Sequence, residues 1–250
     1  MATKLHLDLD SSRGTNGGSF SWLFSPSAIA YYQMQGGYAT QPAAISPTWV
    51  YYGTTHNGVY YSHEATIAAG TPATLRVLNP NKEYGYEINI QAHQWKIYAS
   101  NQADSIFGSS VNNDWIDAGG GSDTVKVDNS DTVYGGLGND YITATDSNFI
   151  YSQASNFSDP HGDSRFDNDT IIAQHKNYID AGIGDDSIVA KSSDTIYAGD
   201  GNDQVHASDH SYIDAGSGND TVDFDYYAHH STVIGGDGQD SLVAGESDIV

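Results

Sequence analysis

The sequence predicts an all-β protein, in which a parallel β-roll over residues 96–250 follows a small antiparallel, sandwich-like β domain or cap over residues 1–95. Three observations predict this division. A short Gly- and Asp-rich pattern recurs through the second half of the chain at a nearly constant step. The formal net charge of -23 arises after residue 100, because residues 1–100 hold five acidic and five basic side chains. The first hundred residues instead alternate apolar and polar side chains in short runs.

The repeat reads [GA]-G-x-G-x-D-x-U, where U is an aliphatic residue. Six copies begin at residues 118, 135, 181, 198, 215 and 235, so the steps are 17, 46, 17, 17 and 20 residues. The gap of 46 residues contains a degenerate copy, Asp167-Asn-Asp169-Thr-Ile171. Between copies lies a second polar turn followed by an aliphatic residue, as in Asp194-Thr-Ile196. Each coil is therefore expected to hold two turns and two very short strands.

A coil of this size cannot bury its own apolar residue, so successive coils must stack. Stacking is expected to form one aliphatic ladder after the repeat and a second ladder after the intervening turn. The first ladder comprises Val125, Ile142, Ile188, Val205, Val222 and Leu242, and the second includes Val133, Ile196 and Ile213.

The repeated turns have the composition of a hard-cation site. Glycine permits positive φ and leaves the backbone carbonyls accessible. Of the 27 acidic residues after residue 100, only Glu246 is a glutamate, and short carboxylates suit tight turns and cation ligation. Two carboxylates and several carbonyl oxygens form the kind of cage that Ca²⁺ prefers. The predicted calcium-binding residues are Asp123, Asp140, Asp186, Asp203, Asp220, Asp240, Gly119, Gly121, Gly136, Gly138, Gly182, Gly184, Gly199, Gly201, Gly216, Gly218, Gly236 and Gly238, with Asp169 of the degenerate copy.

Folding and calcium binding are expected to be one event. Without a cation, the stacked carboxylates would repel one another across a coil spacing of about 4.8 Å. The same charge argues against nucleic acid and anionic membrane surfaces as partners. The sequence has no cysteine and no apolar run of 18 residues, so neither disulfides nor a membrane span are expected.

These six copies resemble the calcium-binding repeats of the repeats-in-toxin (RTX) family over about residues 105–250. The resemblance implies a calcium β-roll, secretion, and export by a type I exporter that reads an uncleaved C-terminal segment. The start of the sequence has no signal-peptide pattern, and Ser247-Asp248-Ile249-Val250 resembles the end of such exported chains. Four copies begin with Ala, and the intervening turn lacks the motif. One row of calcium sites is therefore expected, with the other edge closed by Ser, Asp and Asn turns without metal.

The N-terminal region is rich in aromatic residues. Aromatic side chains there form either a core and an interface to the roll or a surface that stacks on sugar rings. The candidate ligand-binding residues are Trp22, Trp49, Tyr52 and Tyr61. The corresponding partner would be an extracellular polysaccharide or a cell-surface glycan, and the corresponding role adhesion.

No catalytic residue is predicted. The sequence lacks the HExxH, G-x-S-x-G and P-loop patterns, and it has no cysteine nucleophile. An enzymatic role is left open and is the less favoured reading. The alternative function is a secreted carbohydrate-active enzyme of the epimerase or lyase type, or a non-catalytic module of one.

Overall fold

The computed structural model describes the chain in segments and holds strands, bridges and turns in them. The described residues are 5–7, 49–50, 65–68, 74–76, 86–91, 96–99, 101–108, 113–153, 167–225, 228–243, 245 and 247–250. No helix occurs in these segments. None of them therefore holds a helix of the length and apolarity that a membrane crossing requires.

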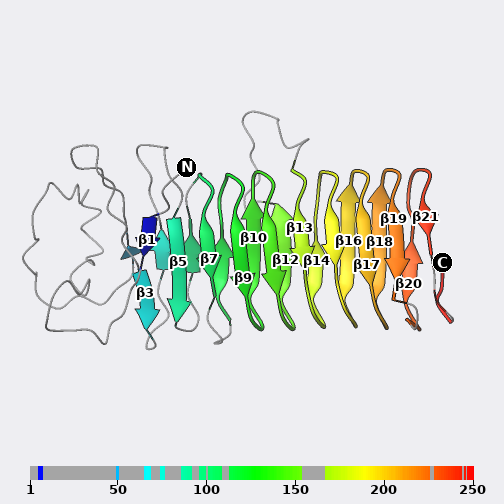
Figure 1. Ribbon diagram of the computed structural model, residues 1–250, viewed down its shortest axis with the longest axis horizontal. Coiled ribbons are helices and arrows are strands. Elements are labelled where there is room, and N and C mark those ends of the chain that lie inside the picture. The colour runs from blue at the N-terminus through cyan, green and yellow to red at the C-terminus, as the bar shows by residue number, and fades with distance from the viewer. Residues whose placement is uncertain are drawn as a thin grey trace, which may run out of the picture.

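The strands form two sheets in which every pairing is parallel (Figure 1). Sheet A has 11 strands: β1 (Leu5–Leu7), β3 (Ala65–Ala68), β5 (Tyr86–Gln91), β7 (Ser105–Phe107), β9 (Thr124–Val127), β11 (Tyr141–Ala144), β13 (Thr170–Ile172), β15 (Ser187–Val189), β17 (Gln204–Ala207), β19 (Thr221–Phe224) and β21 (Ser241–Leu242). Sheet B has 10: β2 (Trp49–Val50), β4 (Thr74–Arg76), β6 (Lys96–Tyr98), β8 (Trp115–Asp117), β10 (Thr132–Gly136), β12 (Phe149–Gln153), β14 (Tyr178–Asp180), β16 (Thr195–Asp200), β18 (Tyr212–Ser217) and β20 (Thr232–Ile234). From β5 onward, successive strands alternate between the sheets, so the chain winds as a parallel β-roll, as the sequence predicts.

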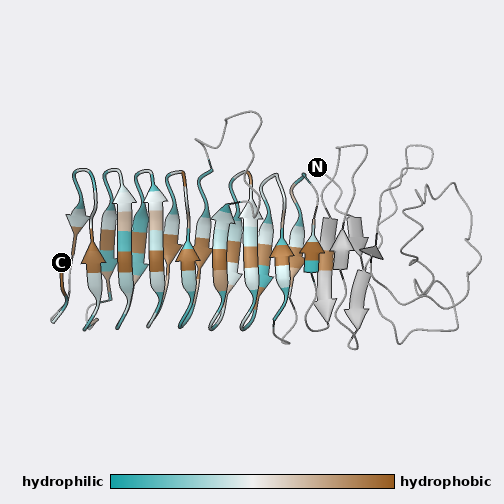
Figure 2. Ribbon diagram, turned by 180° about the vertical axis from the view of Figure 1, so that it is seen from behind, coloured by the Kyte–Doolittle hydropathy of each residue, from teal (hydrophilic) through white to brown (hydrophobic). Residues whose placement is uncertain are grey.

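The core is a double ladder of aliphatic side chains between the two sheets. In sheet A, Val125 pairs with Ile142 and Ile188 with Val205. In sheet B, Val133 pairs with Ile150 and Ile196 with Ile213. These side chains are at most 2% exposed, and Figure 2 shows the apolar band running across the strands. Burial of one such side chain contributes about 1.5–3 kcal/mol, so the stacked coils stabilise one another.

The expected antiparallel pairing of the N-terminal region is wrong for the strands described there. β1 and β3 both pair parallel with β5, and β2 pairs parallel with β4. Ile88 of β5 pairs with Ile106 of β7 and is fully buried, so β5 extends the roll's ladder toward the N-terminus. The turn-rich segments between these strands read as hairpins in the sequence. Parallel stacking is favoured because it continues the same apolar column.

The structure describes little of the predicted aromatic ligand surface. Trp22, Tyr52 and Tyr61 lie outside the described residues, and only the backbone of Trp49 is placed, in β2. The division into residues 1–95 and 96–250 stays a prediction.

Candidate metal centre

One edge of the roll is formed by the repeated Gly-rich turns, each between a sheet B strand and the next sheet A strand; we call it the glycine edge. The second and fourth residues of each motif have positive φ, for example Gly199 at 113° and Gly201 at 147°. A Cβ on Gly199 would overlap the carbonyl oxygen of Gly182, and one on Gly201 the carbonyl oxygen of Gly184. The backbone carbonyls of one coil therefore point at the α-carbons of the next, which only glycine allows.

An uninterrupted column of aspartates runs beside these carbonyls. Each backbone N–H in the column donates to the Oδ1 of the aspartate one coil further on, over 2.6–3.1 Å. The column comprises Asp104, Asp123, Asp140, Asp169, Asp186, Asp203, Asp220 and Asp240. The structure thus brings all seven aspartates predicted from the sequence into one line. It adds Asp104, which precedes β7 and starts an Asp-Ser-Ile sequence that matches the end of the motif without its glycines.

The second carboxylate oxygen of these side chains is buried without a hydrogen-bond partner. This holds for Oδ2 of Asp140, Asp169, Asp186, Asp203 and Asp220. A buried carboxylate oxygen that lacks a donor costs several kcal/mol unless a proton or a cation neutralises it. A row of bound cations, or protonation, would therefore stabilise the oxygens along this column.

Burial is the main cause of a large rise in pKa along the column. It raises the pKa of Asp140 to about 8 and that of Asp169 to about 7. The pKa of Asp186 rises to about 9, because the charges of Asp169 and Asp203 add to the effect of burial. The pKa of Asp203 rises to about 7 for the same reasons, with Asp220 as the first neighbouring charge. At neutral pH the folded roll without a cation would bind protons at these sites.

The oxygens present fit calcium rather than a softer metal. The sites offer carboxylates and backbone carbonyls, the hard ligands of Ca²⁺, and the chain has no cysteine. Among the described residues, no three acidic or histidine side chains converge on a common point. A cage on this edge therefore needs backbone carbonyls in addition to carboxylates, as the sequence predicts.

The opposite edge, between each sheet A strand and the next sheet B strand, has its own buried column, which sequence analysis missed. The same backbone N–H to side-chain oxygen contacts connect its members over 2.7–3.4 Å. The column comprises Asp114, Asp131, Asn148, Asn177, Asp194, Ser211, Ser231 and Asp248. The residue before the column member has positive φ in each turn, and it is not glycine, as at Ser130, Ser193 and His210.

Neutral side chains satisfy much of the opposite edge without a cation. Asn148 Nδ2 donates to Asn177 Oδ1 and to the carbonyl of Asp128. Asn177 Nδ2 donates to Asp194 Oδ1 and to the carbonyl of Thr145. These amide groups supply the hydrogens that the carboxylates of the glycine edge lack. Oδ2 of Asp131 and of Asp194 is nevertheless buried without a hydrogen-bond partner, and burial raises the pKa of Asp131 to about 7. The absence of metal from this edge therefore stays a prediction, which the two asparagines favour.

A column of aromatic rings crosses the outer face of sheet B. Each ring contacts the next, with centroids 4.8–5.9 Å apart. The column comprises Tyr98, Trp115, Tyr134, Tyr151, Tyr178, Tyr197 and Tyr212. Phe149 lies beside it, 6.1 Å from Tyr178, and is 51% exposed. Asp117, Asp180 and Asp214 share its outward register, so the face combines aromatic rings with carboxylates.

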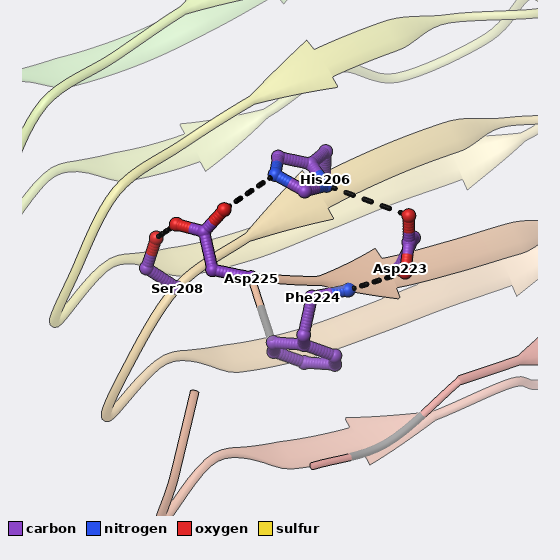
Figure 3. Close-up of polar contacts among 5 residues, drawn as sticks. All are labelled: His206, Ser208, Asp223, Phe224 and Asp225. Carbon is purple, nitrogen blue, oxygen red and sulfur yellow. Dashed lines mark hydrogen bonds and ion pairs between the residues drawn. The ribbon is translucent and has the colours of Figure 1, made fainter. Parts of the chain in front are cut away.

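A polar cluster on the outer face of sheet A lacks an activated nucleophile (Figure 3). His206 Nε2 lies 3.1 Å from Asp225 Oδ1, and His206 Nδ1 lies 3.7 Å from Asp223 Oδ2. Ser208 Oγ donates to the other oxygen of Asp225, so the hydroxyl contacts the carboxylate and not the imidazole. The hydrogen bonds from Ser208 and His206 lower the pKa of Asp225. The imidazole therefore does not contact the hydroxyl, and the lowered pKa makes Asp225 a weak base for it.

The fold and the glycine edge together define a calcium-binding β-roll. The model of the RTX calcium-binding nonapeptide repeat (4 copies) matches residues 98–126, 127–148, 191–209, 208–225 and 230–248. The chain is an RTX β-roll protein, and Ca²⁺ is its cofactor. No curated protein and no solved structure matches the chain.

Proposed function

We propose that this protein works outside the cell as a calcium-dependent roll, whose coils close only when a row of Ca²⁺ binds along the glycine edge. The observation that carries the proposal is the unbroken column of buried aspartates, with unpartnered Oδ2 atoms from Asp140 to Asp220. Their mutual repulsion opposes folding, and calcium would convert it into attraction. The two glycines of each motif place the carbonyl oxygens that would complete each cage.

A titration with a matched charge control tests this coupling. Circular dichroism of the full chain at pH 7.5 should lose most of its β signal as EGTA removes calcium and regain it on calcium addition. Asp203→Asn should raise the calcium midpoint severalfold. Asp237→Asn removes the same charge from an exposed position of a motif turn and should leave the midpoint unchanged. A β signal that survives complete chelation at this pH contradicts the proposal.

Secretion is part of the same proposal. RTX repeat proteins are typically secreted, and a fold that needs calcium at extracellular levels stays open where calcium is scarce. Affinities of roughly 10⁻⁴–10⁻³ M per site, typical of extracellular modules, would give this behaviour. Co-expression with a type I exporter, with and without residues 247–250, tests the predicted export signal. Equal secretion of both forms would show that these four residues are not the signal.

A second proposed function is adhesion to an extracellular polysaccharide or cell-surface glycan. The aromatic column of sheet B favours it, because the rings lie beside the carboxylates of Asp117, Asp180 and Asp214, and the hydroxyls of Thr132 and Thr195. Aromatic surfaces with nearby hydrogen-bond acceptors suit sugar rings.

A glycan array with and without calcium tests adhesion. Binding should require calcium and weaken in Tyr134→Ser and Phe149→Ser, whereas Lys126→Ser on sheet A should bind like the unaltered chain. Release of reducing ends from a bound glycan would instead indicate the alternative, a carbohydrate-active enzyme. Absence of any calcium-dependent glycan binding overturns the adhesion proposal and leaves the calcium proposal intact.

A further inference from the structure

Between the first and the last copy of the motif, the aspartate column of the glycine edge passes through one coil that lacks the motif glycines. Most neighbouring members of the column are 17 residues apart, but Asp140 and Asp169 are separated by 29. The strands on both sides keep their register across this point, since Ile142 pairs with Ile171. Counted back from Asp169, the place of the fourth motif residue, which is glycine in all six copies, is taken by Asp167.

In the regular coils, the amide of the fourth motif glycine donates to a backbone carbonyl of the next coil. Gly121 donates to Leu137, Gly184 to Asp200 and Gly201 to Ser217, over 2.7–2.8 Å. Gly138 departs from this rule, because its amide contacts Oδ1 of the Asp167 side chain. A carboxylate oxygen thus takes the position that a backbone carbonyl oxygen holds in the other coils.

The backbone of Asp167 still behaves as a motif residue. Its carbonyl oxygen faces the α-carbon of Gly184, as the carbonyl of Gly184 faces that of Gly201. This coil therefore keeps the backbone carbonyl that the fourth residue presents in the regular motif turns, and the Asp167 side chain adds one carboxylate. The Asp167 side chain is buried, at 4% exposure, beside the column whose carboxylate oxygens lack hydrogen-bond partners.

Three buried carboxyl groups of the column interact with Asp167. Asp140, Asp169 and Asp186 are each 2% exposed, and each has an Oδ2 without a hydrogen-bond partner. The charge of Asp167 contributes to the raised pKa of all three of these carboxyls. Asp167 is therefore close enough to interact with the members of the column on both sides of it.

We propose that Asp167 is a calcium ligand, and that the coil without glycines carries the tightest site of the row instead of a break in it. The proposal rests on calcium binding along the glycine edge. The Asp167 carboxylate adds one negative charge to the cage, and ligand charge is one of the two properties that set calcium affinity. The ion at this site would join the coils before residue 153 to those after residue 167.

Stepwise calcium binding to the full chain, measured by isothermal titration calorimetry and native mass spectrometry, tests this assignment. The unaltered chain should show one ion bound about tenfold more tightly than the rest, a factor set by ligand charge. Asp167→Asn removes the charge and should return that ion to the affinity of the others. Asp167→Gly restores the motif residue and should do the same. Asp200→Asn, an exposed carboxylate of a regular turn, is the control and should keep the tight ion.

The outcomes separate this inference from the broader proposal. A tight ion that persists in Asp167→Gly overturns the assignment of Asp167, even if Asp167→Asn does not fold. A row of equal affinities in the unaltered chain overturns it as well, while calcium binding stands. No calcium binding at all, with the fold intact, would instead overturn the proposed function.

Discussion

The two edges of the roll use the same backbone device with different side chains. On both edges, a backbone N–H donates to a side-chain oxygen one coil further along. On the glycine edge every member of the column is an aspartate, whereas on the opposite edge half are asparagine or serine. Asn148 and Asn177 donate hydrogens of their own, so that edge has fewer carboxylates to neutralise, although Oδ2 of Asp131 and of Asp194 is buried there without a hydrogen-bond partner.

The comparison separates what shapes a turn from what makes it bind metal. Ser193 and His210 adopt positive φ as glycines do, so this backbone shape does not need the motif. What the glycine edge adds is the close approach of carbonyls from coil to coil and a full column of carboxylates. Calcium dependence should follow those two features and not the turn itself.

The largest expected effect is on the calcium-free roll, whose folding stability should fall as the pH rises. The folded-state pKa values of Asp140, Asp186 and Asp203 are about 8, 9 and 7, against about 3.9 in an unfolded chain. A raised folded pKa contributes stability that is fully present below the unfolded value and is lost as pH rises through the folded value. In EGTA, the β signal by circular dichroism should therefore be greater at pH 5 than at pH 8.

Calcium should reverse this trend, because protons compete with it for the same oxygens. With excess calcium, the thermal midpoint should rise between pH 5 and pH 8. A calcium-free chain that becomes more folded with rising pH would contradict the charge account of the glycine edge.

The next effect comes from one alanine substitution on each edge. Gly201→Ala places a Cβ against the carbonyl oxygen of Gly184 at a φ of 147°, so it should prevent closure of that coil at any calcium concentration. Ser193→Ala on the opposite edge keeps a Cβ that the turn already holds and should change stability by less than about 1 kcal/mol. Chemical unfolding in saturating calcium measures both. Similar losses would show that the two edges pack alike.

The loss of calcium affinity on substituting an aspartate of the column should depend on the position of that aspartate in the column. Asp203 bonds to the coils on both sides, through Asp186 and Asp220, whereas Asp240 accepts from Asp220 alone. Asp203→Asn should therefore raise the calcium midpoint of folding more than Asp240→Asn. The circular dichroism titration compares the two, and equal midpoints would argue against ligands shared between neighbouring sites.

The smallest effect should have the opposite sign. Burial raises the pKa of Asp194 on the opposite edge to about 6, so its charge opposes folding at pH 7. Asp194→Asn keeps an oxygen for the amide of Asn177 and removes that charge, so it should stabilise the roll by on the order of 1–2 kcal/mol. Urea unfolding in saturating calcium measures it. Destabilisation, or a weakened calcium response, would indicate that this edge also holds a cation.

The spacing of the repeat was enough to predict the parallel roll, both aliphatic ladders and the aspartates that line one edge. It did not reveal the column on the opposite edge, because Ser130 and Lys176 adopt positive φ without the glycine that usually signals it. The sequence also did not indicate the proposed role of Asp167, because its side-chain oxygen accepts the hydrogen bond that a backbone carbonyl accepts in the regular coils. The N-terminal strands were assigned the wrong pairing because their irregular spacing conceals the shared register of Leu75 and Ile97.

The central claim is that calcium binds along one edge only, and anomalous diffraction tests it most directly. Crystals of the full chain grown in calcium should give anomalous peaks between successive coils beside Asp140, Asp186, Asp203 and Asp220, in a line along the glycine edge. The opposite edge, beside Asp131 and Asp194, should give none. Peaks of comparable height on both edges would contradict the account, because a motif-free column would then bind calcium as well as the glycine-rich one.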